Sequence, residues 1–251
     1  MKRLVYIFFL FCLSVPVKNI GQDITALQKE AERLETTNEE EAFRTYQEIL
    51  HLQPVNINAL CKSSELCSTI GHRQTAKTAQ INYFKAGRRF AEAALHLQPN
   101  NSEANFAMAL AMGRIALISS GREKIEAVAE IKRYAEISVK SDPNNFKPYH
   151  ALGKWHYEVS DLNGLERTAA KLLYGGLPPA SLAEATAYYE KSRELNPDFT
   201  LNYLELARCY HRSNQNPKAL DMLRRLLSMN FKTQDDLRVK EEGKKLLKAW
   251  Q

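Results

Sequence analysis

Amphipathic runs fill most of this chain and are separated by short tags that contain proline. Four tags share one layout, in which a proline follows one amphipathic run and precedes another: Leu52-Gln53-Pro54, Leu97-Gln98-Pro99, Ser141-Asp142-Pro143 and Leu195-Asn196-Pro197. Because proline stops a helix, each tag is expected to end one helix, and polar residues such as Asn56 and Asn101 to begin the next. The pattern predicts a repeated unit of helix, turn, helix and proline.

Small and large residues alternate around the tags in a way that suits close helix packing. Ala42 and Tyr46 precede the first tag, Ala185 and Tyr189 precede the last, and Gly153 lies between them. This arrangement resembles the tetratricopeptide repeat family over most of the chain. We therefore predict an all-α, tetratricopeptide-like antiparallel helix-pair solenoid of about ten to twelve helices.

The spacing of the tags departs from the standard repeat. Successive tag prolines, at positions 54, 99, 143 and 197, are 45, 44 and 54 residues apart, whereas a standard repeat has about 34 residues. The middle repeats should therefore contain elongated helices or insertions. We place an inserted helix after the fourth first-helix, and we interpret Trp155 as packing against it.

One stretch carries a more specific resemblance. It rests on three segments: the Trp-containing segment 150–159, the segment 165–179 that ends in Gly-Gly-Leu-Pro-Pro, and the run from Ala185 to Pro197. With these segments the chain resembles the regulator of microtubule dynamics family over about residues 100–215. In that family a Trp-containing helix precedes an inserted helix that ends in a Gly-x-Pro-Pro-like turn. The resemblance implies a tetratricopeptide-like domain and, as an alternative function, a binding protein like the microtubule-dynamics regulators.

The N-terminus has the layout of an export signal. Lys2 and Arg3 precede the apolar run 4–13, which Pro16 and Gly21 follow. We expect residues 1–21 to be a signal peptide, or an uncleaved anchor that would be the chain's one membrane contact, and the protein to be exported, periplasmic or envelope-associated if bacterial. Residues 22–232 would form the repeat domain, and residues 233–251 a C-terminal capping helix.

Composition, charge and motifs argue against nucleic-acid binding, metal binding and catalysis. The formal charge of +6 includes Lys2, Arg3 and Lys18, so the chain after residue 21 carries 6 − 3 = +3, which is too weak to indicate nucleic acid. No His pair lies four apart beside a carboxylate or cysteine set, and no Gly-x-Ser-x-Gly occurs. We predict no metal, no cofactor and no catalysis, and we expect Cys61 and Cys67 to be buried on a single helix.

The inner side of a helical-repeat solenoid is lined by the first helix of each pair. The positions expected there are Phe106, Arg114, Lys147, His150, Lys154, Tyr157, Leu201, Arg208 and Arg212. Five cations beside aromatic residues suit an acidic peptide or a chain-terminal carboxylate, although solvated surface charge is the alternative.

The predicted function is therefore a non-catalytic scaffold or adaptor that binds a protein or peptide partner in a concave, partly cationic groove. Self-association through a repeat face is a further possibility. An alternative from a different class is an accessory subunit or hydrolase with its site near the inserted helix, around Lys154, His156, Glu158 and Glu166.

Overall fold

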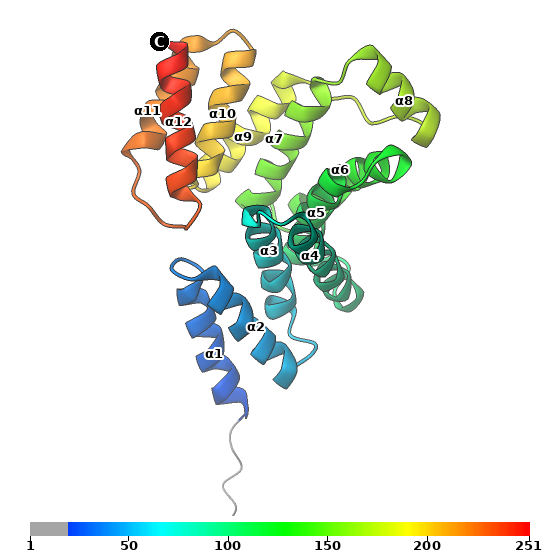
Figure 1. Cartoon of the computed structure of the whole chain (residues 1–251), viewed down its shortest axis with the longest axis vertical. Coiled ribbons are helices and arrows are strands. Elements are labelled where there is room, and N and C mark those ends of the chain that lie inside the picture. Colours follow the sequence, from blue (N-terminus) through cyan, green and yellow to red (C-terminus); the bar gives the residue numbers. More distant parts are fainter. Residues whose placement is uncertain (1–19) are drawn as a thin grey trace, which may run out of the picture.

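The computed structural model describes residues 20–251, which form twelve α-helices and no β-strand (Figure 1). In chain order they are α1 (Ile20–Leu34), α2 (Glu39–Leu52), α3 (Ile57–Arg73), α4 (Lys77–Leu97), α5 (Ser102–Ile118), α6 (Gly121–Ser141), α7 (Phe146–Ser160), α8 (Gly164–Tyr174), α9 (Leu182–Leu195), α10 (Thr200–Arg212), α11 (Asn216–Ser228) and α12 (Asp236–Trp250). Residues 1–19, and with them nearly all of the predicted signal segment, lie outside this range.

Each proline tag ends the second helix of a pair, as predicted. The helices α2, α4, α6 and α9 all stop two residues before their tag proline. Three of the helices that follow begin at an asparagine whose side-chain oxygen accepts a backbone N–H of the first turn: Asn56, Asn101 and Asn145. Such capping satisfies a donor that the helix itself leaves unpaired.

The helices pack as successive antiparallel pairs, α1–α2, α3–α4, α5–α6, α7–α9 and α10–α11, with α12 packed on the last pair. The predicted all-α, tetratricopeptide-like solenoid is therefore confirmed. The helices α4 and α6 each have 21 residues, which accounts for the first two long tag spacings. Within residues 20–251, no helix is both long enough and apolar enough to cross a membrane.

The helix α8 is the predicted insertion, between α7 and α9, and it projects from the solenoid beside α6 (Figure 1). An asparagine and a glutamate, Asn163 and Glu166, cap its start reciprocally, and Gly175 ends it with a positive φ of 84°. Trp155 is buried as expected, but its indole nitrogen donates to the carbonyl oxygen of Val128 in α6, at 2.7 Å. The contact that orients Trp155 therefore comes from α6.

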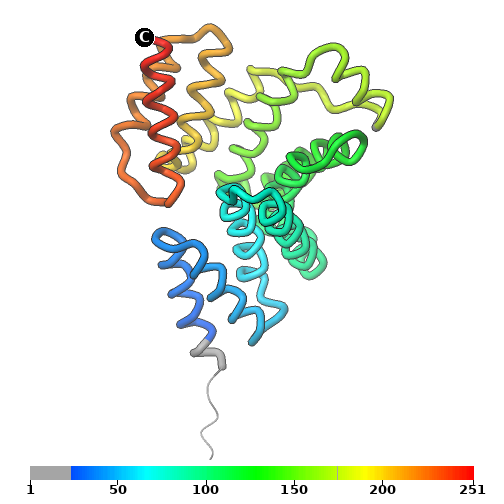
Figure 2. The backbone as a smooth tube through the Cα atoms, in the orientation of Figure 1, coloured from blue at the N-terminus to red at the C-terminus, as the bar shows by residue number. Residues whose placement is uncertain are grey.

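The two ends of the solenoid touch. The side-chain amide nitrogen of Gln234 donates to the backbone oxygen of Thr37 at 2.9 Å, and Arg73 Nη1 lies 3.6 Å from Asp235 Oδ1. We call these two interactions the closing contact. They bring the loop before α12 to the α1–α2 turn and to the end of α3; in Figure 2 this orange loop faces the blue α1–α2 turn.

Candidate functional site

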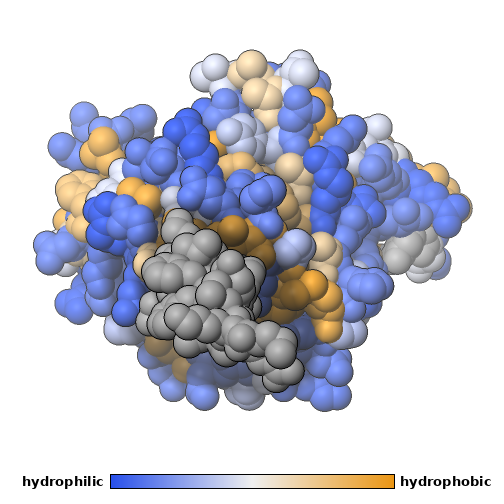
Figure 3. All heavy atoms as spheres, turned by 90° about the horizontal axis from the view of Figure 1, so that it is seen from below, coloured by the Kyte–Doolittle hydropathy of each residue, from blue (hydrophilic) through white to orange (hydrophobic). Residues whose placement is uncertain are grey.

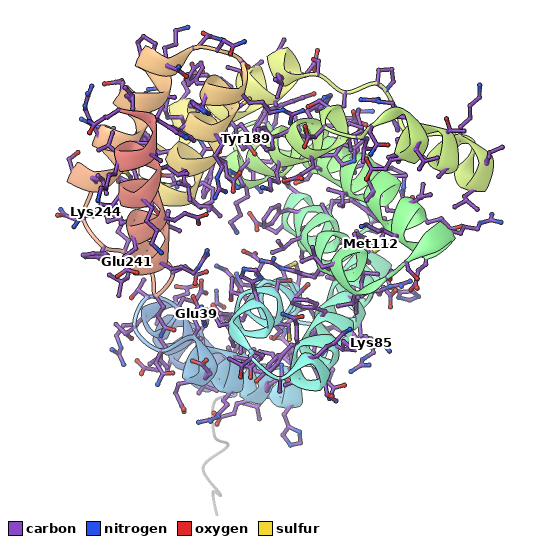
Figure 4. All side chains as sticks on the ribbon, turned by 45° about the horizontal axis from the view of Figure 1, so that its top comes forward. Glu39, Lys85, Met112, Tyr189, Glu241 and Lys244 are labelled. Carbon is purple, nitrogen blue, oxygen red and sulfur yellow. The ribbon has the colours of Figure 1, made fainter. Side chains whose placement is uncertain are left out.

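The first helices α3, α5, α7 and α10, together with α12, surround a common centre, and many of their side chains project toward it (Figure 4). We define the inner face by seven of the predicted residues that these helices carry: Phe106, Arg114, Lys147, Lys154, Tyr157, Arg208 and Arg212. The position of each follows from helical spacing, since residues three or four apart share one side of a helix.

Lys147 joins three first helices. Its ammonium nitrogen lies 3.1 Å from Glu65 Oε2 of α3 and 2.9 Å from Glu103 Oε2 of α5, and 5.3 Å from the centre of the Phe106 ring. Burial alone would lower the pKa of Lys147, but the two carboxylates outweigh it and raise the pKa. Lys147 is therefore a fixed cation, and Phe106 lies buried beneath it.

Glu205 holds the next two cations. Its carboxylate belongs to a buried side chain and accepts from Lys154 at 3.0 Å and from Arg208 at 2.9 Å. Arg208 also pairs with Glu242 of α12. Burial would raise the pKa of Glu205, but Lys154 and Arg208 lower it. Ion pairs thus connect α3 and α5 to α7, α7 to α10, and α10 to α12.

Tyr157 lies between two cations, each of which has one largely exposed carboxylate partner besides a more buried contact, Glu205 for Lys154 and the Tyr157 backbone oxygen for Arg212. The ring centre is 5.6 Å from Lys154 Nζ and 4.9 Å from the Arg212 guanidinium carbon. Lys154 also pairs with Glu158 at 2.9 Å, and Arg212 with Asp161 at 2.7 Å. The side chains of these two carboxylates are 59% and 73% exposed, so water competes for both pairs.

Arg114 differs from the other cations of the inner face. Among the five, it is the one with no ion pair to any residue between 20 and 251. Its Nε atom is buried without a hydrogen-bond acceptor in that range, and its guanidinium carbon lies 5.8 Å from the centre of the Phe84 ring. Burial lowers the pKa of Arg114 to about 10, so the side chain stays charged at neutral pH.

The two remaining predicted positions serve the packing of the helices. His150 shares a 2.9 Å hydrogen bond with Asn202 Oδ1 and lies against the rings of Tyr189 and Phe199. Burial lowers the pKa of His150, which favours its neutral form. Leu201 packs on the hydrophobic cluster of α9 to α12.

The sequence interpretation missed the carboxylates that accompany these cations. Two pairs carry a local signal, because Glu205 precedes Arg208 by three residues and Lys154 precedes Glu158 by four, spacings at which opposite charges meet on a helix. Glu65 and Glu242 carry no such signal toward Lys147 and Arg208, since each pair depends on how separate helices pack. The inner face is therefore a charge-paired surface with one uncompensated arginine.

The alternative site near the inserted helix is not assembled. Lys154 and Glu158 are paired, but both ring nitrogens of His156 are buried without a hydrogen-bond partner among the described residues, and Glu166 caps α8. No three His, Cys, Asp or Glu side chains between residues 20 and 251 are placed to hold a metal ion. Cys61, Cys67 and Cys209 are buried free thiols, as predicted for the first two.

A pocket of about 230 Å³ lies between α4, α5 and α6 and is lined by none of the predicted residues. Met108, Met112 and Ile115 form its apolar lining, and four glutamates and one arginine lie around them; Met112 is labelled in Figure 4. Seen from the α1 end, the surface of the molecule is mainly hydrophilic, and hydrophobic residues appear as separate patches (Figure 3).

Comparison with known proteins gives one consistent family. The model of the family described as regulator of microtubule dynamics protein 1-3 matches residues 27–251. The chain is 26% identical over 225 residues to regulator of microtubule dynamics protein 3 of Xenopus laevis, which covers 86% of this chain and 48% of that protein. It is 27% identical over 167 residues to human protein 2, covering 66% and 41%, and 26% identical over 161 residues to protein 1 of Caenorhabditis elegans, covering 64% and 71%.

Solved structures support the fold alone. The tetratricopeptide repeat protein TTC0263 of Thermus thermophilus superposes with a TM-score of 0.65 at 12% identity, covering 90% of this chain and 98% of that one. PilF of Pseudomonas aeruginosa gives a TM-score of 0.55 at 14% identity, covering 93% and 90%.

The relatives overturn the predicted location. They come from a frog, a human and a nematode and are named as regulators of microtubule dynamics, whereas a periplasm is a bacterial compartment. The prediction of an exported, periplasmic or envelope-associated protein is therefore wrong. The chain spans about half the length of the vertebrate relatives or less. With its family model matched from residue 27 to the last residue, the chain belongs to the regulator of microtubule dynamics protein 1-3 family.

Proposed function

We propose that this chain is a non-catalytic adaptor, like the microtubule-dynamics regulators of its family, and that its inner face binds an acidic segment of a partner protein. The family membership and the tetratricopeptide-like fold support a role in protein interaction. The names of the relatives make microtubules the first partner to test.

The observation that carries the proposal is the pair of cations around Tyr157, each of which has one exposed carboxylate partner that a ligand can replace. Lys154 and Arg212 flank the ring, and the carboxylates of Glu158 and Asp161 that accompany them are largely exposed. An exposed ion pair contributes only about 0–1 kcal/mol, so a carboxylate from a partner can replace the resident one at little cost. The aromatic ring between the cations adds apolar contact area.

The other cations have a different role in this proposal. Lys147 and Arg208 are held by Glu65 and Glu205, whose side chains are 18% and 7% exposed, and Glu205 also fixes Lys154 from the buried side. Removing a partner from such a pair leaves a poorly solvated charge. These cations therefore maintain the inner face, and the partner is recognised at Tyr157 and its two neighbours.

Sedimentation with microtubules assembled from purified tubulin tests the proposal. Binding should weaken by about tenfold or more in the Lys154→Gln, Arg212→Gln double variant, and also as salt rises from about 50 to 200 mM, because exposed charges are screened. The matched control is Arg44→Gln, Arg122→Gln, which neutralises two exposed arginines outside the inner face. Equal binding by both variants, or binding without salt dependence, contradicts recognition at Tyr157.

A further inference from the structure

The region around Arg114 contains donor positions that the protein leaves open. Arg114 Nε is buried without a hydrogen-bond acceptor among the described residues. Arg73 Nη1 is also buried and makes no hydrogen bond in that range. A buried charged donor without an acceptor destabilises the protein, because no hydrogen bond offsets its loss of hydration. An oxygen ligand that accepted from these groups would offset this destabilisation on binding.

One carboxylate is shared in this region. Asp235 Oδ1 lies 3.6 Å from Arg73 Nη1 and 3.9 Å from Arg238 Nε. Its charge also reaches Arg114, where it opposes the effect of burial on the pKa, while the positive charge of Arg238 adds to that effect. Arg73 has a second partner, Glu39, at 2.7 Å, and Arg238 has Glu242 at 4.0 Å. Arg114 therefore remains the guanidinium without a carboxylate in contact.

The charges of Arg114, Arg73, Asp235 and Arg238 also act on His72. Burial lowers the pKa of His72, and the positive charge of Arg114 lowers it further, while Asp235 opposes both. His72 and Arg73 end α3, Arg114 belongs to α5, and Asp235 and Arg238 lie at the start of α12. Two members of this group, Arg73 and Asp235, form part of the closing contact.

We propose that Arg114, whose Nε is buried without an acceptor among the described residues, binds a single carboxylate group of a partner protein, either an Asp or Glu side chain or a chain-terminal carboxylate. This inference rests on the proposed function, since it adds a second recognition point for the same acidic segment. A guanidinium forms two parallel charge-assisted hydrogen bonds with a carboxylate. A monoanion matches the single uncompensated charge, whereas a phosphate dianion would meet stronger repulsion from Asp235.

The charges around the site act on the ligand in opposite directions. A carboxylate bound at Arg114 is attracted by Arg73 and Arg238 and repelled by Asp235, which itself pairs with both arginines.

The test uses the full chain and an acetylated, amidated hexaglutamate peptide as the probe. Wild type should bind the peptide, and Arg114→Gln should weaken binding by about tenfold to a hundredfold, the loss expected when charge-assisted hydrogen bonds disappear. Arg122→Gln, an exposed arginine outside the inner face, should bind as wild type. The pKa of His72, followed by NMR, should rise when the peptide binds to wild type.

Each other outcome overturns the proposal. If Arg114→Gln binds as tightly as wild type, the carboxylate does not bind at Arg114, although recognition at Tyr157 stands. If wild type fails to bind hexaglutamate but binds inorganic phosphate or vesicles of anionic lipid in an Arg114-dependent way, the ligand class is wrong. Failure of the Lys154→Gln, Arg212→Gln variant to change microtubule binding would contradict the proposed function separately. Should Arg114→Gln not fold, Arg114→Lys keeps the charge, loses the paired donors and should still weaken binding.

Discussion

Gly153 of α7 lies directly against the ring of Tyr189 in α9. A Cβ atom at position 153 would be 2.7 Å from Cδ1 of Tyr189, closer than real Cβ contacts come, and the ring is fully buried. The contact joins two helices that the inserted α8 separates in sequence. The absence of a side chain at residue 153 therefore lets α7 and α9 pack as a normal pair despite the insertion.

Replacing Gly153 with alanine should destabilise the protein. The added methyl group must displace the Tyr189 ring, and overpacking a core of this kind costs about 1–3 kcal/mol. Urea unfolding followed by circular dichroism measures the change. Gly164→Ala in α8 is the control, because nothing lies within 4 Å of a Cβ there, and it should change the free energy of unfolding by less than about 1 kcal/mol. Equal effects of the two substitutions would mean that the α7–α9 contact is unimportant.

His156 should make the protein less stable in mild acid. Burial lowers the pKa of this imidazole in the folded state, while the unfolded value is about 6.5. The unfolded chain therefore binds the proton more tightly, so the stability is fully present above pH 6.5 and is lost as pH falls through the folded pKa. His156→Phe should gain stability relative to wild type at pH 5 compared with pH 7.5, in paired urea titrations. A difference independent of pH would contradict this assignment.

Asp236 should be needed to hold α12 in place. The residue is 3% exposed, and its carboxylate accepts from the hydroxyl of Thr200 at 2.5 Å and from the backbone nitrogens of Lys232 and Thr233 at 2.6 and 2.9 Å. Asp236→Ala should cost about 2–4 kcal/mol, because hydrogen bonds to a charged acceptor are lost. Asp236→Asn should cost less, since its amide oxygen can still accept from both backbone nitrogens.

The control for Asp236 is Asp198→Ala, which removes an exposed carboxylate from a pair with Lys232. Thermal unfolding and hydrogen exchange along α12 compare the variants. Equal stability of Asp236→Ala and Asp198→Ala would show that the loop does not depend on the buried carboxylate.

Cys61 and Cys67 should be unreactive in the native protein. Burial raises the pKa of each thiol to about 12, and only the thiolate attacks an alkylating reagent. At pH 8, iodoacetamide should label both residues in urea and leave them unmodified in buffer, as measured by mass spectrometry after a fixed time. Rapid labelling of the native protein would mean that α3 opens locally.

The features that could be predicted from the sequence are local in the chain. The tag prolines and the asparagines that follow them set the ends of helices within a few residues, so the helix pairs and the insertion follow from the pattern. The closing contact joins Thr37 and Gln234, which are 197 positions apart, and it depends on the summed curvature of all the pairs. The contact of Trp155 with Val128 could not be predicted either, because it depends on how α6 and α8 pack around α7.

The functional site also combines features that are local in the chain, which the sequence predicts, with features that depend on how separate helices pack. Phe106, Lys147, Lys154 and Tyr157 lie on the first helices α5 and α7, and a position on a helix follows from spacing that is local in the chain. The carboxylates Glu65 and Glu242 that neutralise two of the cations come from other helices, so a sequence shows positive charge where the folded protein has ion pairs. The isolation of Arg114 becomes visible only after these pairs are known.

The closing contact also has a consequence for how the protein is made. A ribosome adds about 5–20 residues per second, so Gln234 follows Thr37 by roughly 10–40 s, the time that those rates imply for 197 residues. During that interval the first helix pairs can form, because their contacts are between neighbours in the chain. The nascent protein is thus an open arc with its inner side accessible to chaperones, and it becomes a closed one only when the last helix emerges.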